Sequence, residues 1–542
     1  MREKPKGYDY VVVGAGAAGS VVAARLSENP SARVLLIEAG GSDANPLFRL
    51  PGLGFAAGAI ARYNWNFETQ PIPDLGGRRL TLLQGKVMGG SSSMNGMVYS
   101  RGHSSEYDAW AAMGCEGWGF EDLRPFFLKS EANFRGAGPW HGDDGPMRLR
   151  RANPELPICD AFLDAARASG MPVVDDLNAN HPEALGWYDV NIDRGLRHSA
   201  ARAYLHPVRR RKNLTILRNA QVLRVVQTHG RATGVEVLRR GRVENIRATG
   251  EVVLCGGAIM SPILLLRSGI GPANELQEMG IDVRVDATQV GANLQNHPCY
   301  RPQWHCSAPV TARNHVSFAG AARAGLSYLF ARKGVLAESF ASVGGFFRSD
   351  PSLDLADMQV VFLSALPPGG ARTVLELLPR QQGFGLTIYQ GTPYSRGRVS
   401  LASPDPLEAP RIDSGYFSDP RDIHILARGV ERMRDIMRQP EIARFINAEL
   451  APGPDVKTHD DLVAAIRREA GTSYHQCGTC AMGDNEGSVL DLRLRVRGVE
   501  GLRVADNSVM PRLPNAALHA PALMIGEKAA AMILQDIEGG NP

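Results

Sequence analysis

Three glycines near the N-terminus have the spacing with which proteins hold a dinucleotide. Gly14, Gly16 and Gly19 form a Gly-x-Gly-x-x-Gly pattern with Ala15 inside it, and Glu38 follows about twenty residues later. In such a loop the first glycine permits a tight turn, the second lets the backbone approach a pyrophosphate, and the third allows close helix packing. The acidic residue then binds a ribose hydroxyl. The pattern predicts a dinucleotide site but does not distinguish FAD from NAD.

A second glycine-rich loop, residues 85–99, combines small residues with hydroxyl and amide side chains. Such a loop can lie flat against a planar ligand and give it backbone hydrogen bonds. Three adjacent serines, residues 91–93, offer a nucleophile in principle, but the Gly-x-Ser-x-Gly elbow is absent. Binding of phosphate groups is therefore the favoured interpretation of this loop.

Histidine and cysteine side chains could also bind a metal or carry out redox chemistry. Cys477 and Cys480 have the spacing of a Cys-x-x-Cys motif, and His475 precedes them closely. No second cysteine pair, no His-x-x-x-His and no thioredoxin-like order of strand, motif and helix accompanies them. The seven cysteines are an odd number spread thinly along the chain, which is not a disulfide pattern. We expect reduced thiols and no metal site.

The segments around the first glycines predict a βαβ unit. Residues 8–13 are a β-branched run, residues 20–26 can form a helix rich in alanine and valine, and residues 34–37 are a second apolar strand that ends at Glu38. Later segments predict a small antiparallel meander that returns to the parallel sheet, an insertion typical of flavin-binding variants of the doubly wound fold. These segments are residues 214–217, 220–226, 234–238 and 251–254.

The remaining segments predict a second sheet and a return to the first. Three strand-like runs, expected in one further sheet, are separated by proline- and glycine-rich connections such as residues 367–370. These runs are residues 357–362, 386–389 and 397–401. Near the C-terminus, residues 502–506 predict a strand and residues 522–534 a helix. A cofactor domain built from both ends of the chain is the economical interpretation.

Length and composition fit this picture. A chain of 542 residues exceeds the ~250 to 300 residues of a single core, and 44% hydrophobic with 21% charged residues excludes a disordered or fibrous protein. The net charge of +4 is too small to predict a nucleic-acid or anionic-membrane partner. The longest uncharged apolar stretch, residues 252–266, falls short of the ~20 residues of a membrane span. Because the N-terminus has no apolar signal core, we expect a cytoplasmic protein.

Beyond these patterns, the chain resembles the glucose-methanol-choline (GMC) oxidoreductase family. Residues 85–108 follow the family's first signature except at Met88, where a branched aliphatic residue or tryptophan is usual, and residues 257–271 follow the second. The resemblance extends over the whole chain, through residues 291–298, 474–483 and 501–506. Asn296 stands where an aspartate is common, at a position that we expect to be structural.

The resemblance implies a fold class and its division into domains. The expected class is α/β, with an FAD-binding doubly wound, Rossmann-like domain and an inserted α+β substrate-binding domain that contains a mainly antiparallel sheet. The FAD-binding domain would be discontinuous. Its expected segments are residues 1–155, 196–300 and 470–542, and those of the substrate-binding domain are residues 156–195 and 301–469.

The resemblance also implies where FAD binds. Glu38 would bind the adenosine ribose, the backbone of Val222 would lie near the adenine, and Asp506 near the ribityl and pyrophosphate groups. The pyrophosphate and flavin would contact a further set of residues: Gly14, Ala15, Gly16, Gly19, Val87, Gly89, Gly90, Ser91, Asn95, Gly96, Met97, Val98 and His519. One family branch attaches FAD covalently through a histidine just before the loop asparagine. Here that residue is Met94, whose thioether cannot form the link, so we expect non-covalent FAD.

Two of the thirteen histidines have positions that imply catalysis. His475 lies in the family's Tyr-His-x-x-Gly-Thr-Cys pattern, and His519 precedes the last helix, where the family carries an asparagine or a histidine. Alcohol oxidation removes a hydroxyl proton and a hydride, and a neutral imidazole with a pKa near 6.5 can take the proton. His475 is expected to do so, while His519 holds the substrate oxygen over the flavin.

The resulting hypothesis is FAD-dependent oxidation of a primary alcohol to an aldehyde, with hydride transfer to flavin N5. The expected substrate is a neutral aromatic, furanic or polyol alcohol, since no carboxylate-aromatic cage for a quaternary ammonium is evident. The electron acceptor is oxygen or a quinone-type compound. Two alternatives remain: a hydroxynitrile-type lyase on the same scaffold with redox-silent FAD, and a nucleotide-binding protein without catalysis. The sequence leaves open the particular alcohol, the acceptor, the oligomeric state and the role of Cys477 and Cys480.

Overall fold

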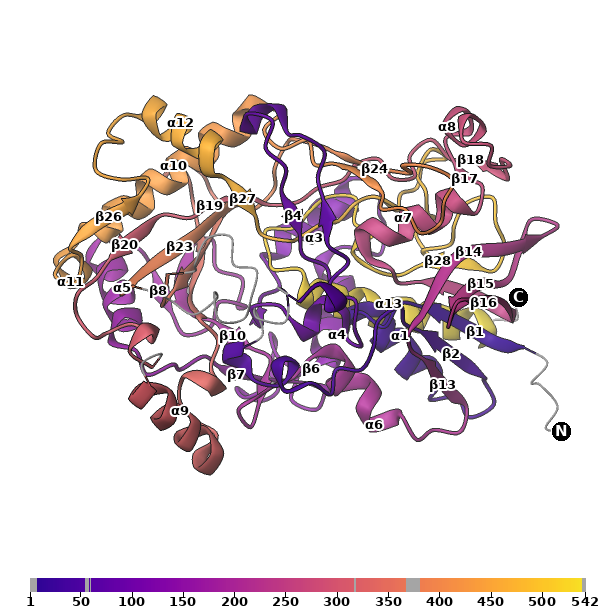
Figure 1. The fold of residues 1–542 in the computed structure, drawn as a ribbon, viewed down its shortest axis with the longest axis horizontal. Helices are drawn as coiled ribbons and strands as arrows, with labels where there is room; N and C mark the ends of the chain where they lie inside the picture. The colour runs from indigo at the N-terminus through magenta and orange to yellow at the C-terminus, as the bar shows by residue number, and fades with distance from the viewer. Residues whose placement is uncertain (1–6, 54–57, 59, 316–317, 367–380, 539–542) are drawn as a thin grey trace.

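The computed structural model describes residues 7–53, 58, 60–315, 318–366 and 381–538. Two large sheets with separate cores lie at opposite ends of the elongated molecule, as Figure 1 shows. The predicted connection at residues 367–370 lies outside the described residues.

The first sheet is the predicted doubly wound sheet. Its parallel part has the order β13-β2-β1-β16-β28, and β14 and β15 extend it as an antiparallel meander on β16. Its strands are β1 (Tyr8–Val13), β2 (Val34–Ile37), β13 (Leu214–Leu217), β14 (Ala220–Thr228), β15 (Arg231–Arg239), β16 (Arg242–Leu254) and β28 (Leu502–Val504). The βαβ unit, the meander and the C-terminal strand are confirmed.

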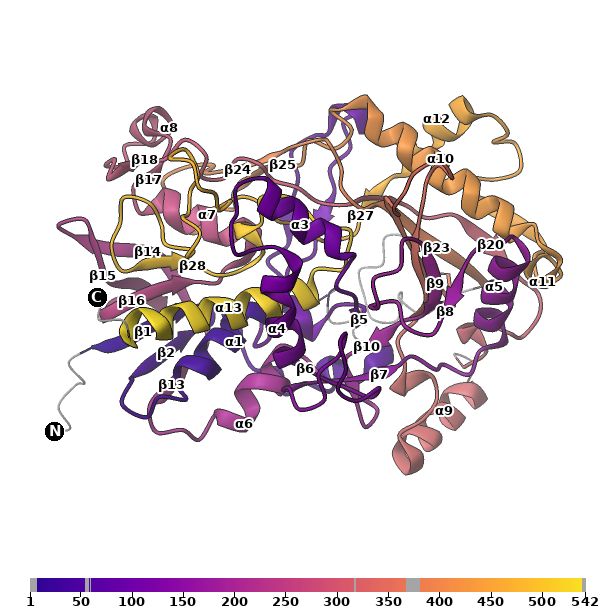
Figure 2. The same ribbon diagram turned by 180° about the vertical axis from the view of Figure 1, so that it is seen from behind.

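Helices from the two ends of the chain pack together on this sheet. Helix α1 (Ala17–Leu26) contacts β1, β2 and α13 (His519–Glu538), which Figure 2 shows lying along the sheet. A Cβ at Gly526 would lie 2.8 Å from the Cβ of Val21, so glycine lets the two helices approach closely. A third helix, α7 (Gly257–Arg267), packs on β14. The C-terminal helix was predicted from its apolar residues and is confirmed.

The second sheet has nine strands, mostly antiparallel. They are β8 (Val173–Val174), β9 (Ala184–Trp187), β19 (Pro298–Tyr300), β20 (Gln303–His305), β21 (Ala341–Phe347), β22 (Met358–Leu363), β23 (Gly383–Gln390), β26 (Ala448–Ala451) and β27 (Gly471–Thr472). One face packs against α5 (Pro157–Ala168) and α10 (Pro420–Met437), and α12 (His459–Glu469) lies on α10. Because side chains alternate along a strand, the other face is free to line a cavity.

One strand prediction is wrong. The run at residues 397–401 was expected in the second sheet, but β24 (Arg398–Ser400) pairs with β25 (Arg411–Asp413) in a separate two-stranded sheet. Val399 and Ile412 are buried in the core of the first sheet. The alternating pattern predicts a strand without naming its partner. The division of the chain at the expected domain boundaries stays a prediction.

Smaller elements complete the described structure. A four-stranded sheet has the order β5-β10-β7-β6, from β5 (Val98–Tyr99), β10 (Asp189–Val190), β7 (Met147–Arg151) and β6 (Glu131–Asn133). The short strands of the two-stranded sheets are β3 (Phe67–Glu68), β4 (Thr81–Leu82), β11 (Ile192–Asp193), β12 (Leu196–Arg197), β17 (Ile270–Gly271) and β18 (Val285–Asp286). The other helices are α3 (Ser104–Ala112), α4 (Phe120–Ser130), α6 (His206–Val208), α8 (Ala273–Glu278), α9 (Phe318–Ala331) and α11 (Pro440–Ala443).

Candidate active site

A cavity of about 1370 Å³ is lined by residues from both large sheets. On one side it meets the carboxyl ends of β1 and β2, where ligands of doubly wound folds bind. On the other side it is lined by alternate residues of two strands, Val361 and Leu363 of β22 and Thr387 and Tyr389 of β23. Their neighbours, including Val360 and Phe362, are buried in the core on the opposite face. The cavity is the candidate active site.

The first glycine loop has the geometry that its pattern predicts. Gly14 has a φ of 101°, and a Cβ there would lie 2.4 Å from the carbonyl oxygen of Cys255. A Cβ at Gly19 would lie 2.0 Å from the carbonyl oxygen of Gly14. At Gly16 the nearest protein atom would be 4.0 Å away, so packing within the protein does not require that glycine. Its missing side chain instead leaves room in the cavity, which fits a pyrophosphate bound to the backbone.

Glu38 lines the cavity at the end of β2 and is tied to the glycine loop. Its carboxylate accepts hydrogen bonds from the backbone N–H groups of Ala15 and Gly40, both at 2.8 Å. Burial raises the pKa of Glu38 to about 7, although these two bonds and the charge of Lys86 lower it. The carboxylate is thus held beside the loop, where a ribose hydroxyl can reach it.

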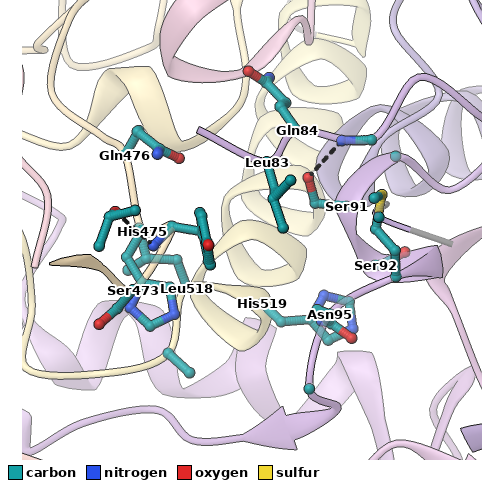
Figure 3. Close-up of a pocket in the computed structure, with 18 of the residues that line it drawn as sticks. Leu83, Gln84, Ser91, Ser92, Asn95, Ser473, His475, Gln476, Leu518 and His519 are labelled. Carbon is teal, nitrogen blue, oxygen red and sulfur yellow. Dashed lines mark hydrogen bonds between the residues drawn. The ribbon is translucent and has the colours of Figure 1, made fainter. Parts of the chain in front are cut away.

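The second glycine loop packs on the first. The Gly89 N–H donates to the Ala15 carbonyl oxygen at 2.8 Å, and the φ of Gly89 is 87°. Ser91 Oγ accepts a hydrogen bond from the Gly85 N–H at 3.1 Å (Figure 3). The hydroxyls of Ser92 and Ser93 donate to carbonyl oxygens of their own loop, at 2.6 and 2.7 Å. Serine hydroxyls used in this way shape the loop, and none is bonded to a histidine.

Asp506 joins the first sheet to the cavity wall. It is buried and accepts hydrogen bonds from the Gly257 N–H at 2.8 Å and the Ser261 hydroxyl at 2.6 Å. Burial raises its pKa, although these bonds lower it. Asp506 and Val222 both line the cavity.

Most of the predicted site residues meet at this one cavity. Those that line it are Gly14, Gly16, Glu38, Gly90, Ser91, Asn95, Gly96, Met97, Val98, Val222, His475, Asp506 and His519. Four others lie behind the wall and support it: Ala15, Gly19, Val87 and Gly89. Their contacts with FAD stay predictions.

His475 is paired with a second histidine that the sequence analysis did not single out. The Nδ1 atoms of His475 and His297 are 2.9 Å apart, and His297 Nε2 lies 2.7 Å from the carbonyl oxygen of Gly391. A carbonyl oxygen only accepts, so His297 carries its proton on Nε2, and its Nδ1 accepts from the Nδ1–H of His475. His475 therefore keeps an unprotonated Nε2, on a side chain that lines the cavity.

Asn296 fixes the backbone of both histidines. Its Oδ1 accepts hydrogen bonds from the N–H groups of His297, at 2.9 Å, and His475, at 2.7 Å. Its Nδ2 donates to Thr472 Oγ1 at 2.9 Å, which an aspartate could not do. Asn296 thus has the structural role that we expected for this position.

Burial keeps this pair uncharged. It lowers the pKa of His475 to about 4, and with the neighbouring His475 it lowers the pKa of His297 well below its usual value. The ring of Tyr389 stacks on His297 with centroids 4.8 Å apart and meets His475 edge-on at 5.6 Å. At neutral pH His475 is a neutral base in a fixed orientation.

His519 is held differently, as the first residue of α13. It is buried and lines the cavity, yet neither ring nitrogen has a hydrogen-bond partner among the described residues. Burial lowers its pKa to about 4, with further contributions from Arg197 and His198. Buried polar atoms are normally satisfied, so these nitrogens indicate a ligand. Figure 3 shows both histidines among the residues that line the pocket.

Arg197, also absent from the sequence analysis, orients Asn95 in the second loop. Its Nη1 donates to the backbone oxygen of Asn95 at 2.7 Å and to Oδ1 at 2.8 Å. Its Nε and Nη2 have no hydrogen-bond partner among the described residues, and burial lowers its pKa to about 9. Because Asn95 Oδ1 accepts from Arg197 and from the Met97 N–H, the Nδ2 group of Asn95 is left to donate elsewhere.

The cysteines near His475 are inaccessible. Cys477 and Cys480 are fully buried free thiols, and burial raises the pKa of both. Among the described residues, one cluster has metal-binding spacing, His141, Asp176 and Asp189, with ligand atoms within 4.8 Å of one another. These side chains already have hydrogen-bond partners. Arg135 donates to both carboxylate oxygens of Asp189 at 2.7 Å, and the ring nitrogens of His141 are bonded to Glu131 and Asp176.

The cavity combines glycine loops suited to a dinucleotide with two neutral imidazoles. Such a combination is typical of a cofactor-dependent oxidoreductase. Family models described as GMC oxidoreductase match residues 8–299 and 393–526. The chain belongs to this family, as the resemblance implied.

Individual relatives match along nearly the whole chain. An oxygen-dependent choline dehydrogenase of Sinorhizobium medicae is 39% identical over 97% of this chain and 95% of its own length. An alcohol dehydrogenase (acceptor) of Pseudomonas putida is 39% identical over 98% and 96%. The crystal structure of pyridoxine 4-oxidase from Mesorbium loti has a TM-score of 0.87 and 31% identity, over 97% of this chain and 98% of the other. An FAD-dependent oxidoreductase from Chaetomium thermophilum has a TM-score of 0.88 and 27% identity, over 98% and 100%.

Proposed function

We propose that the protein oxidises a primary alcohol to an aldehyde with FAD, and that His475 is the general base. The observation that carries the proposal is the His475–His297 pair, because it fixes the proton of His475 on Nδ1 and leaves Nε2, on a side chain that lines the cavity, as an acceptor. The oxidoreductase class is that of the family, and the relatives are named as choline dehydrogenase, alcohol dehydrogenase and pyridoxine 4-oxidase.

The described residues fit FAD. Gly16 leaves space for a pyrophosphate, Glu38 is placed for a ribose, and the loop around Asn95 borders the part of the cavity that contains His519. When bound, FAD supplies the acceptor for the hydride of the alcohol. No side chain need carry out the electron transfer itself.

The two histidines have complementary roles in this proposal. His475 Nε2 takes the hydroxyl proton, and its low pKa keeps it neutral and ready to do so at neutral pH. His519, neutral for the same reason, has one N–H that can donate to the substrate oxygen as negative charge develops there. Both unpartnered nitrogens of His519 would then be near a ligand rather than left in an empty space.

The charges of the cavity wall favour a neutral alcohol over a cationic one. Arg78 and Arg301 line it, and within the described ranges neither has a carboxylate within 4.0 Å. The carboxylate of Glu469 in the same wall is bonded to the Tyr300 hydroxyl at 3.1 Å and lies 3.5 Å from Arg468. Glu469 acts on the charge of Arg78 from beyond ion-pair distance, and the two guanidinium groups, each without a carboxylate within 4.0 Å, repel a quaternary ammonium. We therefore propose an aromatic, furanic or polyol alcohol.

An anaerobic screen of alcohols tests the reaction class. We expect loss of the oxidised-flavin absorbance with a neutral aromatic, furanic or polyol alcohol and not with choline. A lyase of the hydroxynitrile type would leave the absorbance unchanged while splitting its substrate, and a binding protein would show neither reaction. Repeating the best alcohol in air with peroxide detection distinguishes oxygen from a quinone-type acceptor. The cytoplasmic location stays a prediction.

Non-covalent FAD is a separate prediction. Met94, the residue before the loop asparagine, lines the cavity and offers only a thioether. Acid precipitation of the protein should therefore release all flavin absorbance into the supernatant. Yellow colour that stays in the washed pellet would show a covalent link.

A further inference from the structure

The outer face of helix α9 is apolar. Leu326, Leu329 and Phe330 are 56%, 71% and 87% exposed, and their spacing of three and four residues places them on one side of the helix. Figure 1 shows α9 at the edge of the molecule, far from the first sheet. Three large apolar side chains in one exposed patch indicate an interaction surface.

The opposite face of α9 borders the cavity. Ala324 and Tyr328 are buried, and the Tyr328 hydroxyl donates to the Gly195 carbonyl oxygen at 3.1 Å. Ala324 lines the cavity together with Ala312, Val335 and Leu336 from the segments on either side of the helix. A surface that covers the outer face of α9 would therefore lie next to the wall of the candidate active site.

The chain segment that carries this patch has charges of a single sign. Residues 306–337 contain Arg313, Arg323, Arg332 and Lys333 and no aspartate or glutamate. In the part of the chain that the structure describes, none of these four has a carboxylate within 4.0 Å. Arg323, Arg332 and Lys333 are exposed on α9 or just after its end, and the Arg332 guanidinium lies 4.8 Å from the centroid of the Tyr328 ring. Apolar side chains flanked by unpaired basic ones are typical of helices that lie on anionic membranes.

We propose that α9 docks the enzyme on the surface of an anionic phospholipid bilayer. Leu326, Leu329 and Phe330 enter the boundary between headgroups and acyl chains, and the basic residues contact lipid phosphates. Among the described helices none is long and apolar enough to cross a membrane, so the contact is peripheral. A twofold dimer through the same face is disfavoured, because it would bring the unpaired cations of the two copies together. The proposal does not depend on the alcohol-oxidising function.

Vesicle flotation of the full-length, FAD-loaded enzyme tests the proposal. Vesicles of phosphatidylcholine alone are compared with vesicles that also contain phosphatidylglycerol. We expect about tenfold more enzyme on the anionic vesicles at low salt, and less as salt screens the basic residues. An enzyme that floats with neither composition would overturn the proposal.

Three variants separate docking from misfolding. The combined Leu326→Ser, Leu329→Ser and Phe330→Ser variant, and the combined Arg323→Gln, Arg332→Gln and Lys333→Gln variant, should each lose flotation while keeping bound flavin and thermal stability. Leu407→Ser is the matched control, since Leu407 is 58% exposed but lies outside the patch, and it should float like the wild type. If the serine variant floats as well as the wild type, the apolar face does not dock. If it instead loses self-association in sedimentation velocity while the wild type never floats, the face binds a second copy of the chain and the proposal is wrong.

Discussion

The two sides of the cavity hold their histidines in opposite ways. His475 is fixed by two hydrogen bonds that it donates, from its backbone N–H to Asn296 Oδ1 and from its Nδ1–H to His297 Nδ1. His519 is buried at the start of α13, but neither of its ring nitrogens has a hydrogen-bond partner among the described residues. Burial lowers the pKa of both to about 4. Both imidazoles are therefore neutral at neutral pH, but only that of His475 is oriented by hydrogen bonds.

This difference supports the two roles that we propose. A base must present one unprotonated nitrogen before the substrate arrives, and a fixed partner on the other nitrogen secures this. A residue that holds the substrate oxygen can instead be oriented by the ligand, because its N–H may lie on either nitrogen. Substitutions of His475 and of His519 should consequently differ in how much they slow the reaction and in which replacement residues are tolerated.

The largest effect is expected for His475→Ala. Loss of a general base costs about 10² to 10⁴ in rate, and here we expect that loss in the anaerobic rate of flavin reduction with little change in bound FAD. In the wild type, kcat/KM should fall only as pH drops toward about 4, because the base stays neutral above its lowered pKa. His229→Asn is the control, as His229 is an exposed residue with a φ of 50° that asparagine tolerates. A variant that reduces flavin at the wild-type rate would remove His475 from the mechanism.

On the other side, His519→Ala should cost about 10² to 10³, the usual effect of losing one donor to a developing oxyanion. His519→Asn keeps an N–H donor and should stay within about tenfold of the wild type. Stopped-flow flavin reduction by one alcohol measures both. Equal losses in the two variants would mean that the ring, and not its donor, is required at this position.

The sequence predicted more of the cofactor side of the cavity than of the His475–His297 pair. The spacing of Gly14, Gly16 and Glu38 predicted a dinucleotide site, and the family resemblance extended the predicted FAD contacts to the loop around Asn95. The local pattern around His475 marked the histidine itself but not its partner. His297 is 178 residues away, and the two segments meet through the pairing of β19 with β27 and of Gln295 with Cys477. No local rule predicts such a contact.

The same limit explains the other omissions. Arg197 belongs to no recognisable motif, and its role depends on burial beside Asn95, which composition does not reveal. The strand β24 was predicted as a strand but given the wrong sheet, because alternation is a property of one strand and pairing is not. The net charge of +4 gave no sign of the acid-free segment around α9, since an average hides a local excess.

Variants of His297 test whether the rate depends on the orientation of His475. His297→Leu removes the acceptor of the His475 Nδ1–H and should slow flavin reduction about 10- to 10²-fold, the effect of a misplaced catalytic group. His297→Gln keeps an oxygen that can accept and should restore most of the rate. Because a positioning residue acts through kcat, KM should change little in either variant. Equal losses in the leucine and glutamine variants would indicate packing rather than orientation.

The smallest expected effect concerns a third histidine, His141, whose pKa is raised rather than lowered. Burial opposes the charge of His141, but hydrogen bonds to Asp176 and Glu131 outweigh it and raise its pKa to about 9. A raised folded-state pKa contributes stability that is complete below the unfolded value near 6.5 and is lost as pH rises through about 9. The lowered pKa values of His475 and His519 act the other way, so their contribution to stability is lost as pH falls from about 6.5 toward 4.

Denaturant unfolding of the FAD-loaded enzyme measures this effect. The free energy of unfolding of the wild type should exceed that of His141→Asn by on the order of 2 kcal/mol at pH 6, and the difference should shrink by pH 9. A difference that stays constant with pH would mean that His141 contributes by packing and not by its charge.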